Sequence, residues 1–119
     1  MFSAAVSLMS GVLLAHSITM FVGAALFLAL GTAIYRGNTK LIHDYHQRNI
    51  KESERTEYGR AFAKGMFAIC ATLLLSGIIA LFGKDDQIAT VSLIVLFAGL
   101  IISGVVIIKV QKKYNGGLF

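Results

Sequence analysis

Residues 88–108 read IATVSLIVLFAGLIISGVVII, an apolar run without a charged side chain. A hydrocarbon core about 30 Å thick needs about 20 apolar residues at 1.5 Å rise per residue, so this run is long enough to cross a bilayer as a helix. Strands are excluded, because open sheet edges in lipid would leave backbone N–H and C=O groups unpaired. This run therefore predicts a membrane-spanning helix.

Two further stretches of the same kind precede it, at residues 18–35 and 65–82. The 119-residue composition agrees with burial in lipid, since 56% of the residues are hydrophobic, 14% are charged and the mean hydropathy is +0.75. A soluble domain carries about 25% charged residues. The absence of proline favours unbroken helices. We therefore expect one all-α membrane domain with three transmembrane helices.

The basic residues predict its orientation. Seven of the eleven lysines and arginines lie in residues 36–64, three more lie in the tail at 109–119, and only Lys84 lies in the hairpin 83–87. The positive-inside rule then places the basic loop and the tail in the cytoplasm, and the hairpin outside. The pI near 9.6 follows from these basic anchors. No basic patch is interleaved with aromatic residues, so we expect no nucleic-acid partner.

The segment 1–17 is nearly as apolar as the span that follows it. A helix from residue 1 to 35 would be about 50 Å long, which exceeds one comfortable span. Ser3, Ser7, Ser10 and Ser17 share one helical face. Three interpretations stay open: an interfacial helix bending near His16 and Ser17, one long tilted helix whose serine face packs on a partner, or a cleaved signal peptide. We favour the bent or tilted helix.

The loop 36–64 divides into two parts. Gly37 and Asn38 follow the first span and are typical of a helix stop. From Asn49 onward the sequence favours a helix, and Asn49 with Glu52 has the spacing of a capping box. We expect the second span to begin as a cytoplasmic helical extension well before it enters lipid at Gly65.

The membrane-edge loop segment His43-Asp44-Tyr45-His46 is the most conspicuous polar string. His43 and His46 are three residues apart, so on a helix they share a face and are the only candidate metal ligands. A zinc site needs three or four ligands, and a third would have to come from Glu52, Glu54, Glu57 or a second subunit. The alternative is a headgroup-level segment whose Tyr45 and histidines bond the interface. We predict no metal and no cofactor.

The interiors of the three spans contain no Asp, Glu, Lys or Arg, and His16 is the only histidine beside an apolar stretch that could lie within the membrane. Proton relays carry acids and histidines in several spans, so a proton-coupled pump is not expected. A haem site is not expected either, because no two spans offer facing histidines. Cys70 is the single cysteine and lies in an apolar run, where we expect a packed, inert thiol.

Small side chains recur along the spans. In lipid they let helices approach closely, since van der Waals contact drives association there. We interpret them as packing faces, either within the chain or toward a partner. They are Ala25, Ala29 and Ala33 in span one, Ala68, Thr72, Ser76 and Ala80 in span two, and Gly99 and Ser103 in span three.

The order of LGTAI at 30–34, LIHDY at 41–45 and YG at 58–59 resembles a family of small three-span membrane proteins of Gram-positive bacteria, known only as domain of unknown function three-seven-eight-four. The family's loop typically reads leucine-isoleucine-alanine-glycine-tyrosine-asparagine-threonine, and Tyr45 and Tyr58 would match its two tyrosines. The sequence departs from that pattern at His43-Asp44, where alanine-glycine is usual, and at His46-Gln47, where asparagine-threonine is usual. The resemblance covers about residues 18–112 and implies a three-span bacterial membrane protein without implying an activity.

These observations favour a non-enzymatic protein of the bacterial cell membrane. We expect it to bind by its helices as an accessory, scaffolding or protective (immunity-like) subunit of a larger membrane protein. The main alternative is a homo-oligomeric channel or small transporter, in which serine and threonine faces line a path. A metal-dependent enzyme centred on His43 and His46 is a third hypothesis. The expected partners are the lipid bilayer and another membrane protein or a second copy.

Overall fold

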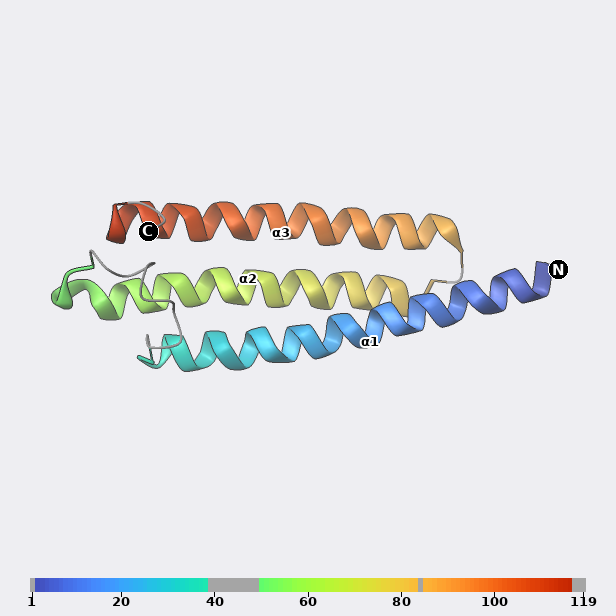
Figure 1. Ribbon diagram of the computed structural model, residues 1–119, viewed down its shortest axis with the longest axis horizontal. Coiled ribbons are helices and arrows are strands. Elements are labelled where there is room, and N and C mark those ends of the chain that lie inside the picture. Colours follow the sequence, from blue (N-terminus) through green and yellow to red (C-terminus); the bar gives the residue numbers. More distant parts are fainter. Residues whose placement is uncertain (1, 39–49, 84, 117–119) are drawn as a thin grey trace.

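The computed structural model describes residues 2–38, 50–83 and 85–116, with side chains from residue 11 onward. Three long helices follow one another along the chain: α1 (Phe2–Tyr35), α2 (Arg55–Leu81), which the 3₁₀ turn η3 (Glu52–Glu54) precedes, and α3 (Asp86–Asn115). Every regular element within these ranges is helical, which confirms the all-α fold (Figure 1). The stretches Gly11–Tyr35, Glu52–Leu81 and Asp86–Asn115 are each long and apolar enough to cross a membrane.

The apolar N-terminal segment is part of α1. Phe2–Tyr35 forms one continuous helix, so the segment 1–17 extends span one without a break. Its N-terminal turns run past the α2–α3 hairpin (Figure 1). The helix stops where the sequence predicts: Gly37 takes a left-handed φ of 113°, and the N–H of Asn38 donates to the Ala33 carbonyl at 3.0 Å.

The other helix boundaries differ from the predicted spans. α3 begins at Asp86, two residues before Ile88, because the Asp85 carboxylate accepts the Ile88 N–H at 3.0 Å as an N-cap. It continues to Asn115, so most of the predicted tail 109–119 is helical, and Gly116 ends it with a φ of 78°. α2 begins ten residues before Gly65, as expected for a helical extension.

Asn49 lies outside the described residues, so the predicted capping box stays a prediction. α2 starts only at Arg55, later than the expected helix start at Asn49. Glu52 and Glu54 belong to η3 instead. Glu54 is the N-cap residue of α2, and its side chain makes no capping hydrogen bond.

In the bundle, α2 lies between α1 and α3. In its most apolar 18-residue stretch 39% of the residues are buried, against 17% in the span of α1 and 11% in α3. Both outer helices pack on α2 and make little contact with each other, and Figure 1 shows α2 running between them. The residues of α1 that face α2 follow the alternating three- and four-residue spacing of left-handed helix packing. Those that are buried are Leu13, Ser17, Ala24, Gly31 and Ile34.

Close approach of the helices depends on glycine at two contacts. A Cβ on Gly77 of α2 would lie 2.9 Å from the Phe21 ring and 3.1 Å from Met20 of α1. A Cβ on Gly99 of α3 would overlap the Thr72 side chain of α2. Both glycines therefore set how near an outer helix comes to α2, as small residues do in lipid.

Candidate functional site

Each helix contributes a fully buried serine within its apolar stretch, namely Ser17, Ser76 and Ser92. Ser76 lies five residues before the end of α2, and Ser92 six residues after the start of α3. At 1.5 Å per residue, this level is about 8 Å inside the helix ends at the hairpin. The half-buried His16 of α1 lies at the same level. These four residues form the polar cluster.

The two serines of α2 and α3 bond each other reciprocally. The Ser92 hydroxyl donates to the Ser76 carbonyl at 2.8 Å, and the Ser76 hydroxyl donates to the Ser92 carbonyl at 3.0 Å. Their Oγ atoms lie 2.9 Å apart. The hydroxyl of Ser17 adds a bond from α1 to the Gly77 carbonyl of α2 at 2.9 Å. At this level α2 therefore makes polar contacts with both α1 and α3.

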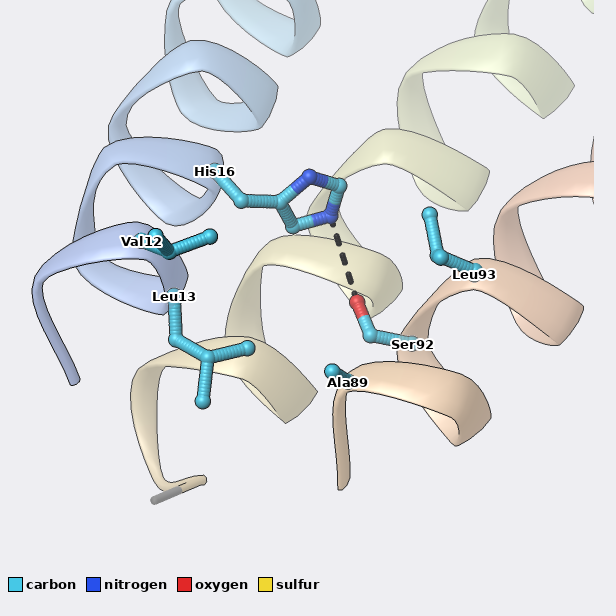
Figure 2. A pocket seen from close by; sticks show the side chains of 6 residues that line it. All are labelled: Val12, Leu13, His16, Ala89, Ser92 and Leu93. Carbon is cyan, nitrogen blue, oxygen red and sulfur yellow. Dashed lines mark hydrogen bonds between the residues drawn. The ribbon is translucent and has the colours of Figure 1, made fainter. Parts of the chain in front are cut away.

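His16 joins all three helices. Its Nε2 lies 2.9 Å from the Ser76 Oγ and 3.2 Å from the Ser92 Oγ; Figure 2 shows the bond to Ser92. A serine hydroxyl has one hydrogen, and each of these hydroxyls has a carbonyl oxygen of the facing helix within 3.0 Å that can accept it. We therefore assign the hydrogen at this contact to Nε2, so that His16 donates to the two oxygens.

This direction of bonding decides what the cluster can do chemically. In hydrolases a histidine accepts the hydrogen of a serine and so activates it as a nucleophile. With the assignment above, Ser76 and Ser92 give their hydrogens to backbone carbonyls, and His16 donates to their oxygens. The arrangement suits a clamp between helices, and interhelical bonds of this kind contribute about 0.6 kcal/mol on average in membrane proteins.

A small cavity adjoins the cluster between α1 and α3. Its volume is about 100 Å³, and its walls are apolar apart from His16 and Ser92. Figure 2 shows Leu13 and Val12 on one side and Ala89 and Leu93 on the other. The cavity exists because α1 and α3 each pack on α2 and not on one another. No side-chain N or O buried in the described parts of the chain lacks a hydrogen-bond partner.

A second buried polar contact holds the opposite end of the bundle. The hydroxyl of the fully buried Tyr58 donates to Gln111 Oε1 at 2.6 Å, which joins α2 to α3. The ring of Tyr58 packs edge-on against Tyr114 with 6.0 Å between centroids. Ile34 of α1 and Ile50 complete this apolar cluster. All three helices therefore meet at the end that carries the basic residues.

The structure uses the predicted small faces unequally. Thr72, Ser76 and Ala80 of α2 are buried, and Ala68 is half-buried. Their partners on α3 are Gly99, which contacts Thr72, and Ser92, which bonds Ser76. Ser103 is also buried, and its hydroxyl donates to the Gly99 carbonyl of its own helix at 2.8 Å. On α1, by contrast, Ala25 and Ala29 are exposed and Ala33 is half-buried.

The membrane-edge loop residues His43, Asp44, Tyr45 and His46 lie outside the described residues, so the metal hypothesis stays a prediction. Within residues 2–38, 50–83 and 85–116, no group of three or more His, Cys, Asp or Glu side chains is placed to hold a metal ion. Cys70 is buried and free.

Sequence reasoning identified Ser76 as a packing residue and missed its bonds to His16 and Ser92. One signal was available: Ser76 and Ser92 are both eight residues from position 84, which lies in the hairpin. In two antiparallel helices joined by a tight turn, residues equidistant from the turn lie at the same level. The position of His16 beside them carries no such signal, because α1 is separated from α2 by a long loop.

Comparison with known proteins adds no relative. No family model, no curated protein and no solved structure matches the chain. The resemblance to the three-span family of Gram-positive bacteria therefore stays a prediction, and the functional argument rests on the geometry of the chain.

Proposed function

We propose that the chain is a non-enzymatic membrane protein that acts by helix–helix binding, as an accessory, scaffolding or protective subunit of a larger membrane protein. One observation carries the proposal: the small faces of α2 and α3 pack against each other, whereas Ala25 and Ala29 of α1 remain on the surface. A small outward face allows a second helix to approach closely in lipid.

The outward face of α1 supports binding through van der Waals contact and not through charge. The serines of the apolar stretches are buried, and Ser76 and Ser92 bond each other and His16. The outward side chains of α1 near Ala29 are apolar, and those of Val22 and Leu26 are more than half exposed. Such a face offers a partner van der Waals contact and no charge.

The channel or transporter alternative has less support. A path through an oligomer needs a polar stripe on an outer face, but Ser17, Ser76, Ser92 and Ser103 are all buried. The exposed Thr19 hydroxyl bonds the Ala15 carbonyl of its own helix at 2.8 Å. Of these serines, Ser17, Ser76 and Ser92 make bonds between the helices.

The position of the chain is part of the proposal. We place it in the bacterial cell membrane with the basic loop 36–64 and the C-terminus in the cytoplasm. Support comes from the basic side chains at one end of the bundle, where α1 ends, α2 begins and α3 ends. Asp85 and Asp86 lie at the opposite end, at the start of α3.

The test is gentle purification from native membranes, followed by mass spectrometry of co-purifying proteins from wild type and Ala29→Leu. We expect a stoichiometric membrane protein with the wild type, and at least a tenfold lower recovery with Ala29→Leu, because the larger side chain separates the two helices. Ala98→Leu, an exposed alanine on α3, is the matched control and should keep the partner.

Two outcomes would contradict the proposal. Purification of the chain as a homo-oligomer without another protein would favour the channel or transporter over the accessory subunit. Equal recovery of the partner by Ala29→Leu and wild type would remove the α1 face from the binding surface. Ser76→Leu and Gly99→Leu are unsuitable tests, because these positions are used inside the bundle and the variants would disturb its packing.

A further inference from the structure

One face of α1 and one face of α2 form a continuous outer seam, here called the α1–α2 seam. On each helix the residues of the seam recur at alternating spacings of four and three, which places them on one side. They are Phe21, Ala25, Leu28, Thr32 and Tyr35 on α1, and Arg60, Lys64, Phe67, Ala71 and Leu74 on α2.

Aromatic contacts join the two faces at the basic end. The rings of Tyr35 and Phe67 have centroids 6.3 Å apart. The Arg60 guanidinium lies 5.4 Å from the centroid of the Tyr35 ring, within the range of a cation–π contact. Tyr35 thus holds the cationic group of α2 beside the end of α1.

Further along the seam the surface becomes an apolar groove. Its volume is about 210 Å³, and both helices contribute to its lining. The lining residues are Phe21, Ala24, Ala25, Leu28, Cys70 and Leu74. The small side chain of Ala25 leaves room here, where a leucine would fill the groove. The seam therefore has a charged end and an apolar end.

Within the described parts of the chain, no acid faces the charge at the basic end from the membrane side. Arg36, Arg60 and Lys64 are exposed, and neither α1 nor the part of α2 between Arg60 and Leu81 contains an acidic residue. The acids of α2 and η3 lie further out along the chain, at Glu57 and before it. Among the described residues, an anion approaching from the membrane therefore meets Lys64 and Arg60 before it meets an acid.

The spacing between the two ends matches one leaflet. Ten residues separate Lys64 from Leu74, which corresponds to about 15 Å along a helix. The hydrocarbon core is about 30 Å thick, so this is the depth that one acyl chain occupies. A molecule with a phosphate at Lys64 would therefore extend its chain into the groove.

We propose that the α1–α2 seam binds one anionic phospholipid, with its phosphate against Arg60 and Lys64 and an acyl chain in the groove lined by Ala25 and Leu28. The planar guanidinium offers the phosphate two parallel N–H donors, and the ammonium adds a point charge. The Tyr35 ring fixes Arg60 in advance and so reduces the ordering that binding requires. The groove shares Ala25 with the partner surface proposed above, whereas the test position of that surface, Ala29, does not line the groove.

The experiment measures lipid binding to the purified full chain by native mass spectrometry. The probes are phosphatidylglycerol and phosphatidylcholine with the same acyl chains, and inorganic phosphate alone. We expect Arg60→Gln with Lys64→Gln to weaken phosphatidylglycerol binding about 30-fold. That factor corresponds to about 2 kcal/mol, since each basic residue beside an anionic leaflet contributes about 1 kcal/mol. Lys112→Gln with Lys113→Gln, an equal charge change on exposed positions of α3, is the control.

A second variant tests the groove without changing the charge. Ala25→Phe fills it and should reduce phosphatidylglycerol retention at least fivefold, whereas Ala98→Phe on the exposed face of α3 should not. A photoreactive group midway along the acyl chain should crosslink to residues of the seam. Three results would each overturn the lipid site. The chain could retain phosphatidylcholine as well as phosphatidylglycerol, or the Arg60/Lys64 and Lys112/Lys113 double variants could lose equal amounts of phosphatidylglycerol. Competition by inorganic phosphate at matched concentration would instead indicate a site for a free anion.

Discussion

His16 of α1 contacts both other helices at the hairpin end of the bundle. Its Nε2 reaches hydroxyls of both α2 and α3, although these serines already bond each other's carbonyls. Its loss therefore leaves the α2–α3 contact intact and loosens α1. Loss of Ser76 removes the donor to the Ser92 carbonyl and one acceptor of His16 together.

We expect His16→Ala to lower the free energy of unfolding in bicelles by about 0.6 to 1.7 kcal/mol, the range of interhelical bonds in lipid. Ser76→Ala should cost at least as much. The double variant should cost less than the sum of the two, because the two side chains share a bond. Thr19→Ala is the control and should stay within about 0.5 kcal/mol, since that exposed hydroxyl bonds only its own helix. A fully additive double variant would contradict the shared bond.

At the scale of the helices, the contact between α2 and α3 depends on which glycine faces the partner. Gly99 and Gly104 both belong to α3. A Cβ at Gly99 would overlap the stiff, β-branched side chain of Thr72, whereas a Cβ at Gly104 would meet nothing within 4 Å. The same substitution at the two positions therefore has opposite consequences.

We expect Gly99→Ala to destabilise the protein by about 1–3 kcal/mol through overpacking. Gly104→Ala should stabilise it by up to about 1 kcal/mol, because alanine is the better helix former. Thermal unfolding in detergent measures both. Combining Gly99→Ala with Thr72→Ala should recover part of the lost stability, since it removes the atoms that the new Cβ meets. Equal effects of the two glycine variants would mean that α3 is rotated differently against α2.

At the scale of the whole molecule, buried polar contacts join the helices at both ends of the bundle, and the segments between these ends are apolar. The polar cluster holds the hairpin end, and Tyr58 with Gln111 holds the basic end. The long axis measures 62 Å, which exceeds the roughly 30 Å of hydrocarbon, so helix ends must extend past the core. The charged residues lie toward those ends.

The proposed topology predicts which cysteines an impermeant maleimide reaches in intact cells. In a Cys70→Ala background, we expect labelling at Gln87→Cys near the hairpin, and labelling at Thr56→Cys only after permeabilisation. Both positions are exposed. Ile101→Cys, on the apolar face of α3, is the control and should stay unlabelled in either state, because it faces hydrocarbon. The reverse pattern would invert the topology, and labelling of both positions in intact cells would contradict the membrane crossing.

The sequence by itself determined that there are three helices long enough to span a membrane and that α1 stops before Gly37. These properties depend on the length of an apolar run and on local helix stops, both of which are readable along one dimension. It also indicated the small faces, although it could not say that those of α2 and α3 would be buried and that Ala25 and Ala29 would be left outside.

Only the tertiary structure decided how each helix is rotated about its axis and which levels meet. In a soluble protein an amphipathic stripe marks the inner side of a helix. Here lipid and core are equally apolar, so Ser17, Ala25 and Ala29 carry no comparable mark of the side they face. The polar cluster of His16, Ser17, Ser76 and Ser92 joins residues up to 76 positions apart, and no local pattern specifies that meeting.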